Sequence, residues 1–171
     1  MTITNNWIHD AVNASPQGYH QDGLGYFNDG VGPSNLLIQG NTIASICNTQ
    51  AIAFQSATGG YDNIQIIGNY VSGYGYTVAP GVGPTATKYF TNSSFVDNVL
   101  GTDIESVWGP LYGWTQANGD VWKCNKINVA AGTHWTNGGN WTPTAADNGL
   151  YWVPASNITS SIDWSGNTSC P

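Results

Sequence analysis

The residues best suited to chemistry lie close together near the start of the chain. They are His9, Asp10, His20 and Asp22, with Tyr19 beside them. A histidine next to a carboxylate can act as a general acid or base near neutral pH. Asp10 and Asp22 could instead form the pair of carboxylates that a glycosidase uses. The pattern therefore predicts that the two histidines and two aspartates are catalytic and that Tyr19 contacts the substrate.

The same cluster also has a structural interpretation. His20 and Asp22 precede an expected strand, where their side chains share a face because side-chain direction repeats every two residues. Short polar side chains at such a position can cap a turn and satisfy backbone donors. The sequence leaves both roles open.

A second candidate region is an aromatic loop formed by Trp108, Tyr112 and Trp114, which follows Asp103 and Glu105. Flat aromatic faces stack on sugar rings, while neighbouring acids and amides bind the hydroxyls. We predict that the three aromatic residues contact substrate. Packing of these rings against the end or side of the fold explains them equally well.

The charge balance restricts the partners. Charged residues make up 8% of the 171 residues, against about 25% in an ordinary domain. There is no arginine, the only lysines are Lys88, Lys123 and Lys126, and the net charge is −7. Binding to nucleic acid depends on lysine and arginine, so it is excluded, and strongly anionic glycans are disfavoured. A neutral polysaccharide is the expected partner.

Other features exclude further classes. No apolar run approaches the roughly 20 residues that cross a bilayer, and the first ten residues lack the segments of a signal peptide. The surface composition still favours an extracellular protein. We therefore expect either a piece of a longer protein or export by another route, with a partner chain or missing flank covering the first repeat. No Cys-x-x-Cys pair or Asp-rich calcium loop occurs, so no metal or cofactor is predicted. Cys124 and Cys170 would be close if their repeats stack.

An internal repeat determines how the candidates are positioned. Six segments share an apolar-x-apolar stretch followed by an asparagine, and the asparagines are Asn6, Asn41, Asn69, Asn98, Asn125 and Asn167. They lie 35, 28, 29, 27 and 42 residues apart. The two longer spacings indicate insertions at about 13–18 and 132–148. Repeats of this length are typical of folds in which each unit packs only on its neighbours.

Each middle repeat also contains a second strand candidate, and these are 22–27, 50–55 and 74–78. They alternate apolar with polar residues, and no segment has a convincing helical stripe. We predict an all-β fold, a single-stranded right-handed parallel β-helix (solenoid) of about five to six rungs with loop insertions. Residues 1–129 would form the rungs, and 130–171 a loop-rich segment with a final rung or cap. Asparagine tolerates left-handed backbone geometry at a bend, and its amides can stack between rungs. A β-sandwich with Asn-Gly turns is the alternative.

The segments Asn5–Asp10, His20–Gly23, Ser34–Ile43 and Tyr61–Val78 resemble right-handed parallel β-helix proteins of the pectate-lyase-like superfamily, secreted by bacteria or associated with phage. The resemblance covers 1–129 and implies a protein that binds polysaccharide. The best-known lyases of that superfamily rely on a basic residue, often arginine, with calcium held by acids. Without arginine that lysis is excluded, and acid–base hydrolysis of a neutral glycan fits better. The sequence leaves open whether the protein is an enzyme or a non-enzymatic structural protein, such as a phage tail component or surface adhesin.

Overall fold

The computed structural model describes residues 1–11, 22–28, 32–46, 50–56, 60–73, 76–79, 90–101, 109–111, 121–129 and 149–152. All regular structure in these ranges is β-strand, and they contain no helix. The expectation of an all-β fold is confirmed for this part of the chain. None of the described elements could span a bilayer as a long apolar helix.

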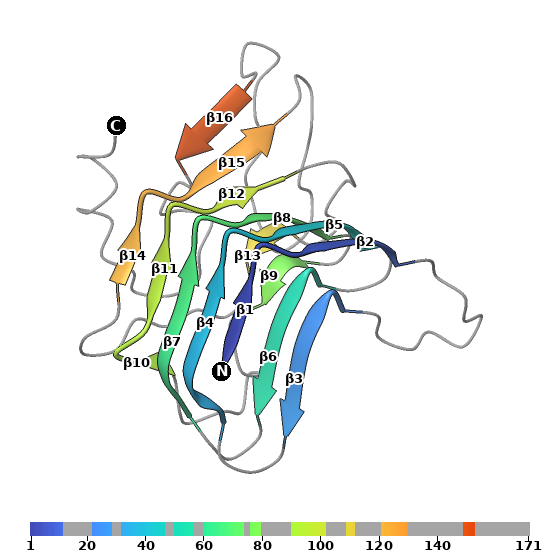
Figure 1. Cartoon of the computed structure of the whole chain (residues 1–171). Coiled ribbons are helices and arrows are strands. Elements are labelled where there is room, and N and C mark those ends of the chain that lie inside the picture. The colour runs from blue at the N-terminus through green and yellow to red at the C-terminus, as the bar shows by residue number, and fades with distance from the viewer. Residues whose placement is uncertain are drawn as a thin grey trace.

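The strands form three sheets (Figure 1). The first sheet contains, in spatial order, β1 (Thr2–Thr4), β4 (Ser34–Gln39), β7 (Tyr61–Ile67), β11 (Ser94–Val96) and β14 (Val121–Lys123), while β10 (Phe90–Thr91) also pairs with β7. The second contains β2 (Trp7–Ala11), β5 (Thr42–Ile46), β8 (Tyr70–Gly73), β12 (Val99–Leu100), β15 (Lys126–Val129) and β16 (Gly149–Trp152). The third contains β3 (Leu24–Asn28), β6 (Ile52–Ser56), β9 (Tyr76–Ala79) and β13 (Gly109–Leu111).

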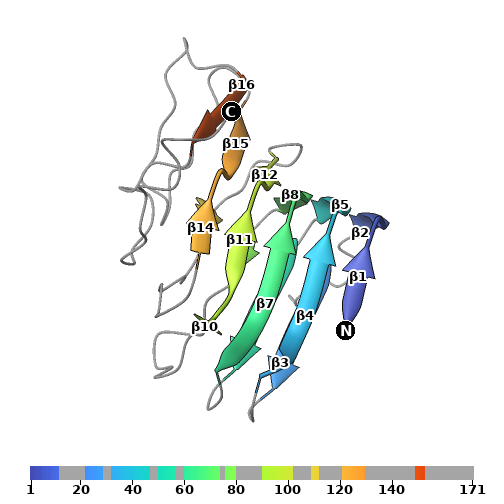
Figure 2. The ribbon, with the colours of Figure 1, turned by 60° about the vertical axis from the view of Figure 1, so that its left-hand side comes forward.

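Apart from β16, the strands pair in parallel with the equivalent strands of the neighbouring repeats. In the first sheet Ile3 pairs with Ile38, Ile38 with Ile66, and Ile66 with Phe95. Figure 2 shows β1, β4, β7, β11 and β14 side by side in chain order. We call the strands of one repeat a layer, so β1, β2 and β3 form the first layer. The three predicted second strands appear as β3, β6 and β9, each starting two residues later than expected.

The core consists of columns of equivalent residues from successive layers. One column is Ile38, Ile66 and Phe95, and another is Ile43, Val71 and Leu100, all at most 1% exposed. An aromatic cluster joins them, in which the rings of Tyr61 and Phe90 stack with centroids 4.9 Å apart and Phe54 meets both edge-on. Each layer has too few apolar side chains to bury them alone, so burial depends on the neighbouring layers.

Buried asparagines link the layers at the bend between the first and second sheets. Each side-chain carbonyl after the first accepts two hydrogen bonds of 2.9–3.0 Å from the preceding asparagine, one from its backbone N–H and one from its Nδ2. The Nδ2 groups after the first also donate to a backbone carbonyl of the preceding layer, as Asn69 does to Ile38 at 3.0 Å. This column, which we call the asparagine ladder, comprises Asn6, Asn41, Asn69, Asn98 and Asn125. The sixth recurrent asparagine, Asn167, lies outside the described residues.

The left-handed residue at this bend is the one before each ladder asparagine. These residues are Asn5, Gly40, Gly68, Asp97 and Cys124, with φ between 55° and 64°. Glycine adopts this geometry without steric cost, and asparagine and aspartate tolerate it better than other residues. The ladder asparagine itself keeps a negative φ, because its backbone N–H must point at the carbonyl of the next asparagine.

The C-terminal part of the structure is described only in β16, which pairs with β15 in antiparallel fashion. β16 therefore covers the outer edge of the second sheet. The predicted insertions lie outside the described residues, and the division at residue 129 stays a prediction. Cys124 is disulfide-bonded. Cys47 and Cys170 are also outside the described ranges, so the closeness of Cys124 and Cys170 stays a prediction.

Removing an interior member of the ladder is expected to destabilise the fold strongly. In Asn69→Ala, the backbone N–H of Asn41 and the carbonyl of Ile38 lose their buried partners, which predicts a loss of about 3 kcal/mol. Urea unfolding followed by circular dichroism measures it. The matched control is Asn6→Ala at the exposed ladder end, where we expect about 1 kcal/mol or less. Equal losses of unfolding free energy in the two variants would contradict the inference that the buried amides of the ladder stabilise the fold.

Candidate functional site

Strand β2 carries a highly exposed aromatic residue. Trp7 is 71% exposed, and its ring stacks on that of His9 with centroids 4.1 Å apart and planes 26° apart. Ile8, between them, packs against the core. Because side chains alternate along a strand, Trp7 and His9 project together from the outer face of the second sheet. A stacked indole and imidazole thus form a flat exposed platform.

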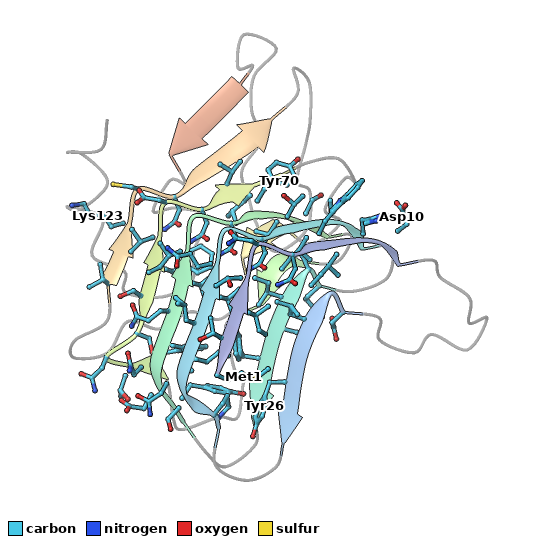
Figure 3. The ribbon with its side chains drawn as sticks, viewed as in Figure 1. Met1, Asp10, Tyr26, Tyr70 and Lys123 are labelled. Carbon is cyan, nitrogen blue, oxygen red and sulfur yellow. The ribbon has the colours of Figure 1, made fainter. Side chains whose placement is uncertain are left out.

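A carboxylate adjoins this platform. Nδ1 of His9 lies 2.7 Å from Oδ2 of Asp10, and the two side chains are 39% and 73% exposed. Figure 3 shows Asp10 at the far end of β2, pointing into solvent. An exposed pair of this kind contributes little to stability. Its geometry suits proton transfer, because with Asp10 accepting the Nδ1 proton the Nε2 atom can accept another.

Asp22 has a structural partner. Its Oδ1 accepts a hydrogen bond of 2.9 Å from the backbone N–H of Gln50, across the bend that precedes β3 and β6. This is the backbone-satisfying role that the sequence left open beside catalysis. Of the four proposed catalytic residues, the structure brings His9 and Asp10 together. His20, Tyr19, Trp108, Tyr112 and Trp114 lie outside the described residues, and their roles stay predictions.

A shallow groove of about 480 Å³ runs over the bend between the first and second sheets. It is lined by Thr4, Asn5, Gln39, Gly40, Ile67 and Gly68. A Cβ at Gly68 would meet no atom within 4 Å, so this part of the groove is open, whereas a Cβ at Gly40 would lie 2.6 Å from Oδ1 of Asn5. Hydroxyl, amide and backbone groups dominate the lining. The groove adjoins the platform through the short connection from Asn5 to Trp7.

Sequence reasoning missed both the platform and the groove. The signal for the platform was available, because the residue after each ladder asparagine begins a strand pointing outward. Tyr70 occupies the same position as Trp7, and a Cβ at Gly101 would lie only 2.3 Å from its ring. The ring of Tyr70 therefore packs against Gly101, whereas the ring of Trp7 is exposed.

A second polar cluster decorates the first sheet. Oδ1 of Asp62 accepts hydrogen bonds from Nδ2 of Asn92 at 2.8 Å and from the Thr91 hydroxyl at 2.9 Å, and Nδ2 of Asn63 donates to Oδ1 of Asn35 at 2.8 Å. The bonds from Asn92 and then Thr91 lower the pKa of Asp62 below its usual 3.8, against a smaller opposing effect of desolvation. Within the described strands, no three His, Cys, Asp or Glu side chains gather as a metal site.

Comparison with protein-family models, with curated proteins and with solved structures finds no significant match to this chain. The resemblance to pectate-lyase-like proteins therefore rests on the sequence repeat, and stays a prediction.

The two interpretations of Asp22 predict different outcomes for one substitution. Asp22→Asn keeps an oxygen that can accept the Gln50 N–H but removes the charge that acid–base catalysis needs. If the role is structural, the free energy of unfolding stays within about 0.5 kcal/mol of the wild type, and Asp22→Ala loses about 1–2 kcal/mol. Chemical denaturation measures both. A loss in Asp22→Asn as large as in Asp22→Ala would contradict this role.

The hydrogen bonds on Asp62 predict a pH dependence. Because its pKa is lowered in the folded state, its contribution to stability is present above 3.8 and is lost as the pH falls through the lowered value. Asn92→Gly permits the φ of 51° at this position but removes the largest cause of the shift, so the Asp62 pKa should rise toward 3.8. Carboxyl NMR titration measures it. Asn35→Gly is the control, and an equal rise there would refute the assignment.

Proposed function

We propose that this protein is a right-handed parallel β-helix of five to six rungs whose outer surface binds a neutral polysaccharide outside the cell. Supporting the fold is the parallel pairing of equivalent strands from successive repeats in all three sheets. Each sheet advances by one repeat per strand, and the bend between two of them carries the same asparagine in five layers. A coil of similar rungs accounts for both observations.

The exposed platform of Trp7 and His9 carries the binding proposal. An indole that is 71% exposed leaves a large apolar face in water, and stacking against the apolar face of a sugar ring removes that face from water. His9 supports the indole from one side at 4.1 Å, which holds the ring in a fixed orientation before any ligand arrives. A preorganised ring loses less conformational entropy on binding.

The groove supplies the polar half of the interaction. Thr4, Asn5 and Gln39 carry hydroxyl and amide groups, which donate to and accept from sugar hydroxyls. The mixture of one apolar side chain, Ile67, with amides suits an uncharged ligand. A net charge of −7 and the exposed carboxylates of Asp10 and Asp62 oppose a strongly anionic glycan.

Two further elements of the proposal concern catalysis and location. The His9–Asp10 pair is the candidate for acid–base cleavage of the bound glycan, with His20 and Asp22 as the other nominated residues and Tyr19, Trp108, Tyr112 and Trp114 as further substrate contacts. The disulfide at Cys124 supports an oxidising compartment, since such bonds persist mainly outside the cytosol. The non-enzymatic alternative, a structural or adhesive protein, keeps the binding surface without turnover.

Binding should depend on the platform. We expect the wild type to bind at least one neutral polysaccharide in affinity electrophoresis, and Trp7→Ala to bind it about three- to tenfold more weakly, the loss typical of one aromatic contact. Because Trp7 is exposed, the variant should fold normally. The matched control is Val121→Ala, an exposed apolar residue on the first sheet that should leave binding unchanged. Binding to anionic glycans alone, or unchanged binding by Trp7→Ala, would overturn the proposal.

The same polysaccharides decide between enzyme and adhesin. Release of new reducing ends that disappears in Asp10→Asn, while binding persists, identifies the His9–Asp10 pair as catalytic machinery. Binding without any release identifies the non-enzymatic protein.

A further inference from the structure

One residue of β2 has a backbone geometry that the repeat does not explain. Several of the described residues have a left-handed backbone, with φ between 51° and 64°. All but one of them fall into two columns that recur from layer to layer. The first column lies at the bend of the asparagine ladder, and the second, near the start of the first-sheet strands, is Asn35, Asn63 and Asn92. Asp10, with a φ of 55°, belongs to neither column, so its geometry has a local cause.

The left-handed backbone changes the direction of the Asp10 side chain. Successive side chains of a regular strand point to opposite faces, and Ile8 packs against the core while His9 is 39% exposed. A regular strand would therefore turn Asp10 toward the inner face that Ile8 occupies. The Asp10 side chain is instead 73% exposed and points outward (Figure 3). Two residues that are neighbours in the sequence thus share one face of the sheet.

The outward carboxylate has a specific partner. Turning outward spares Asp10 from burial, but it does not by itself determine where the side chain lies. Oδ2 of Asp10 lies 2.7 Å from Nδ1 of His9, the distance of a charge-assisted hydrogen bond. Aspartate tolerates the left-handed region better than most residues, although this region is less stable than a strand conformation. An irregular backbone held beside a candidate site is a recognised sign of a functional constraint.

Two contacts in different directions orient the imidazole of His9. The indole of Trp7 stacks on the ring face, with centroids 4.1 Å apart, while Asp10 contacts the ring edge at Nδ1. Stacking restricts tilting of the ring, and the hydrogen bond restricts its rotation within its own plane. No residue in the described part of the chain bonds to Nε2 of His9. This nitrogen is therefore open to a ligand or to water.

The contact with Asp10 also determines which ring nitrogen carries the proton. An ionised carboxylate accepts hydrogen bonds and cannot donate them, so the proton must be on Nδ1. An imidazole without such a partner prefers its proton on Nε2. Asp10 therefore selects the tautomer in which Nε2 carries the lone pair. When Nε2 takes up a proton, the carboxylate and the face of the Trp7 indole both stabilise the positive charge.

From these observations we propose that Asp10 is a positioning residue, whose left-handed backbone turns its carboxylate onto Nδ1 of His9 and so makes Nε2 the proton acceptor of the candidate site. The inference rests on the proposed function and assigns roles within the His9–Asp10 pair. Nε2 of His9 meets the glycan or the water, and Asp10 acts through His9. Because Asp10 is bonded to His9 and Asp22 to the backbone of Gln50, the site favours histidine acid–base chemistry over a pair of carboxylates.

The tautomer of His9 tests this assignment directly. Heteronuclear NMR of the imidazole nitrogens in the isotope-labelled full chain distinguishes the protonated nitrogen from the other in alkaline solution, where the ring is neutral. Loss of signals in His9→Gln assigns them. We expect the proton mainly on Nδ1 in the wild type and mainly on Nε2 in Asp10→Asn, whose amide keeps the left-handed backbone and can donate to Nδ1. A proton mainly on Nε2 in the wild type, or an unchanged tautomer in Asp10→Asn, rules the assignment out.

Asp97→Asn is the matched control. Asp97 is also exposed and left-handed, with a φ of 56°, but it lies at the ladder bend three layers away from His9. This variant loses the same charge and should leave the tautomer of His9 unchanged. An equal change in Asp97→Asn would show that the effect does not come from the Asp10 contact.

Glycan turnover provides a second arm, which separates this role from the proposed function. With soluble neutral glucans, mannans and xylans as probes, Asp10→Asn should lower the release of reducing ends by about tenfold or more. Binding should be unchanged, because Trp7 and His9 remain stacked. Full release in Asp10→Asn despite an altered tautomer contradicts the positioning role. A wild type that binds glycan but releases no reducing ends contradicts catalysis in the proposed function, and the tautomer measurement then decides the assignment of Asp10 alone.

Discussion

The fold depends on a buried primary amide that no single repeat can satisfy. An asparagine side chain in an apolar core is costly unless its donors and acceptor all find partners. Here the carbonyl of each interior ladder residue is satisfied by the layer before it, while its amide bonds to layers on both sides. The repeats must therefore keep one register at this bend. The spacings of 28, 29 and 27 residues among Asn41, Asn69, Asn98 and Asn125 reflect loops whose lengths vary while the bend does not.

This constraint acts on inward positions and leaves outward ones free to vary. Residues beside the ladder alternate between a core column and solvent, so an aromatic ring can be placed outside without disturbing any layer. Two outward residues at the same position illustrate this. The Trp7 ring is exposed and stacks on His9, whereas the Tyr70 ring packs against Gly101. Functional chemistry on such a scaffold is expected on outward side chains close to a bend, where two sheets and a groove meet.

Much of the architecture could be predicted because the ladder asparagines and the apolar columns repeat at nearly constant intervals. The strand order in each sheet follows from that repetition. The left-handed residue was harder to identify, since Asn5 and Asn6 are the same residue type and only the hydrogen-bond geometry distinguishes them. Asp22 was ambiguous for a similar reason, as a carboxylate suits both a backbone N–H and a catalytic role. The Asp62 cluster depends on side chains 29 and 30 residues away, whose direction is set by pairing between layers.

The most direct test of this account is the exchange rate of the backbone amides of Asn41, Asn69 and Asn98, measured by native-state hydrogen exchange. Each of these N–H groups donates to a side-chain carbonyl of the next layer, not to a strand backbone. If the ladder holds the layers together, they exchange only through global unfolding, at the rate of the core amides of Ile66 and Val71. Exchange as fast as that of amides in exposed turns would contradict the account.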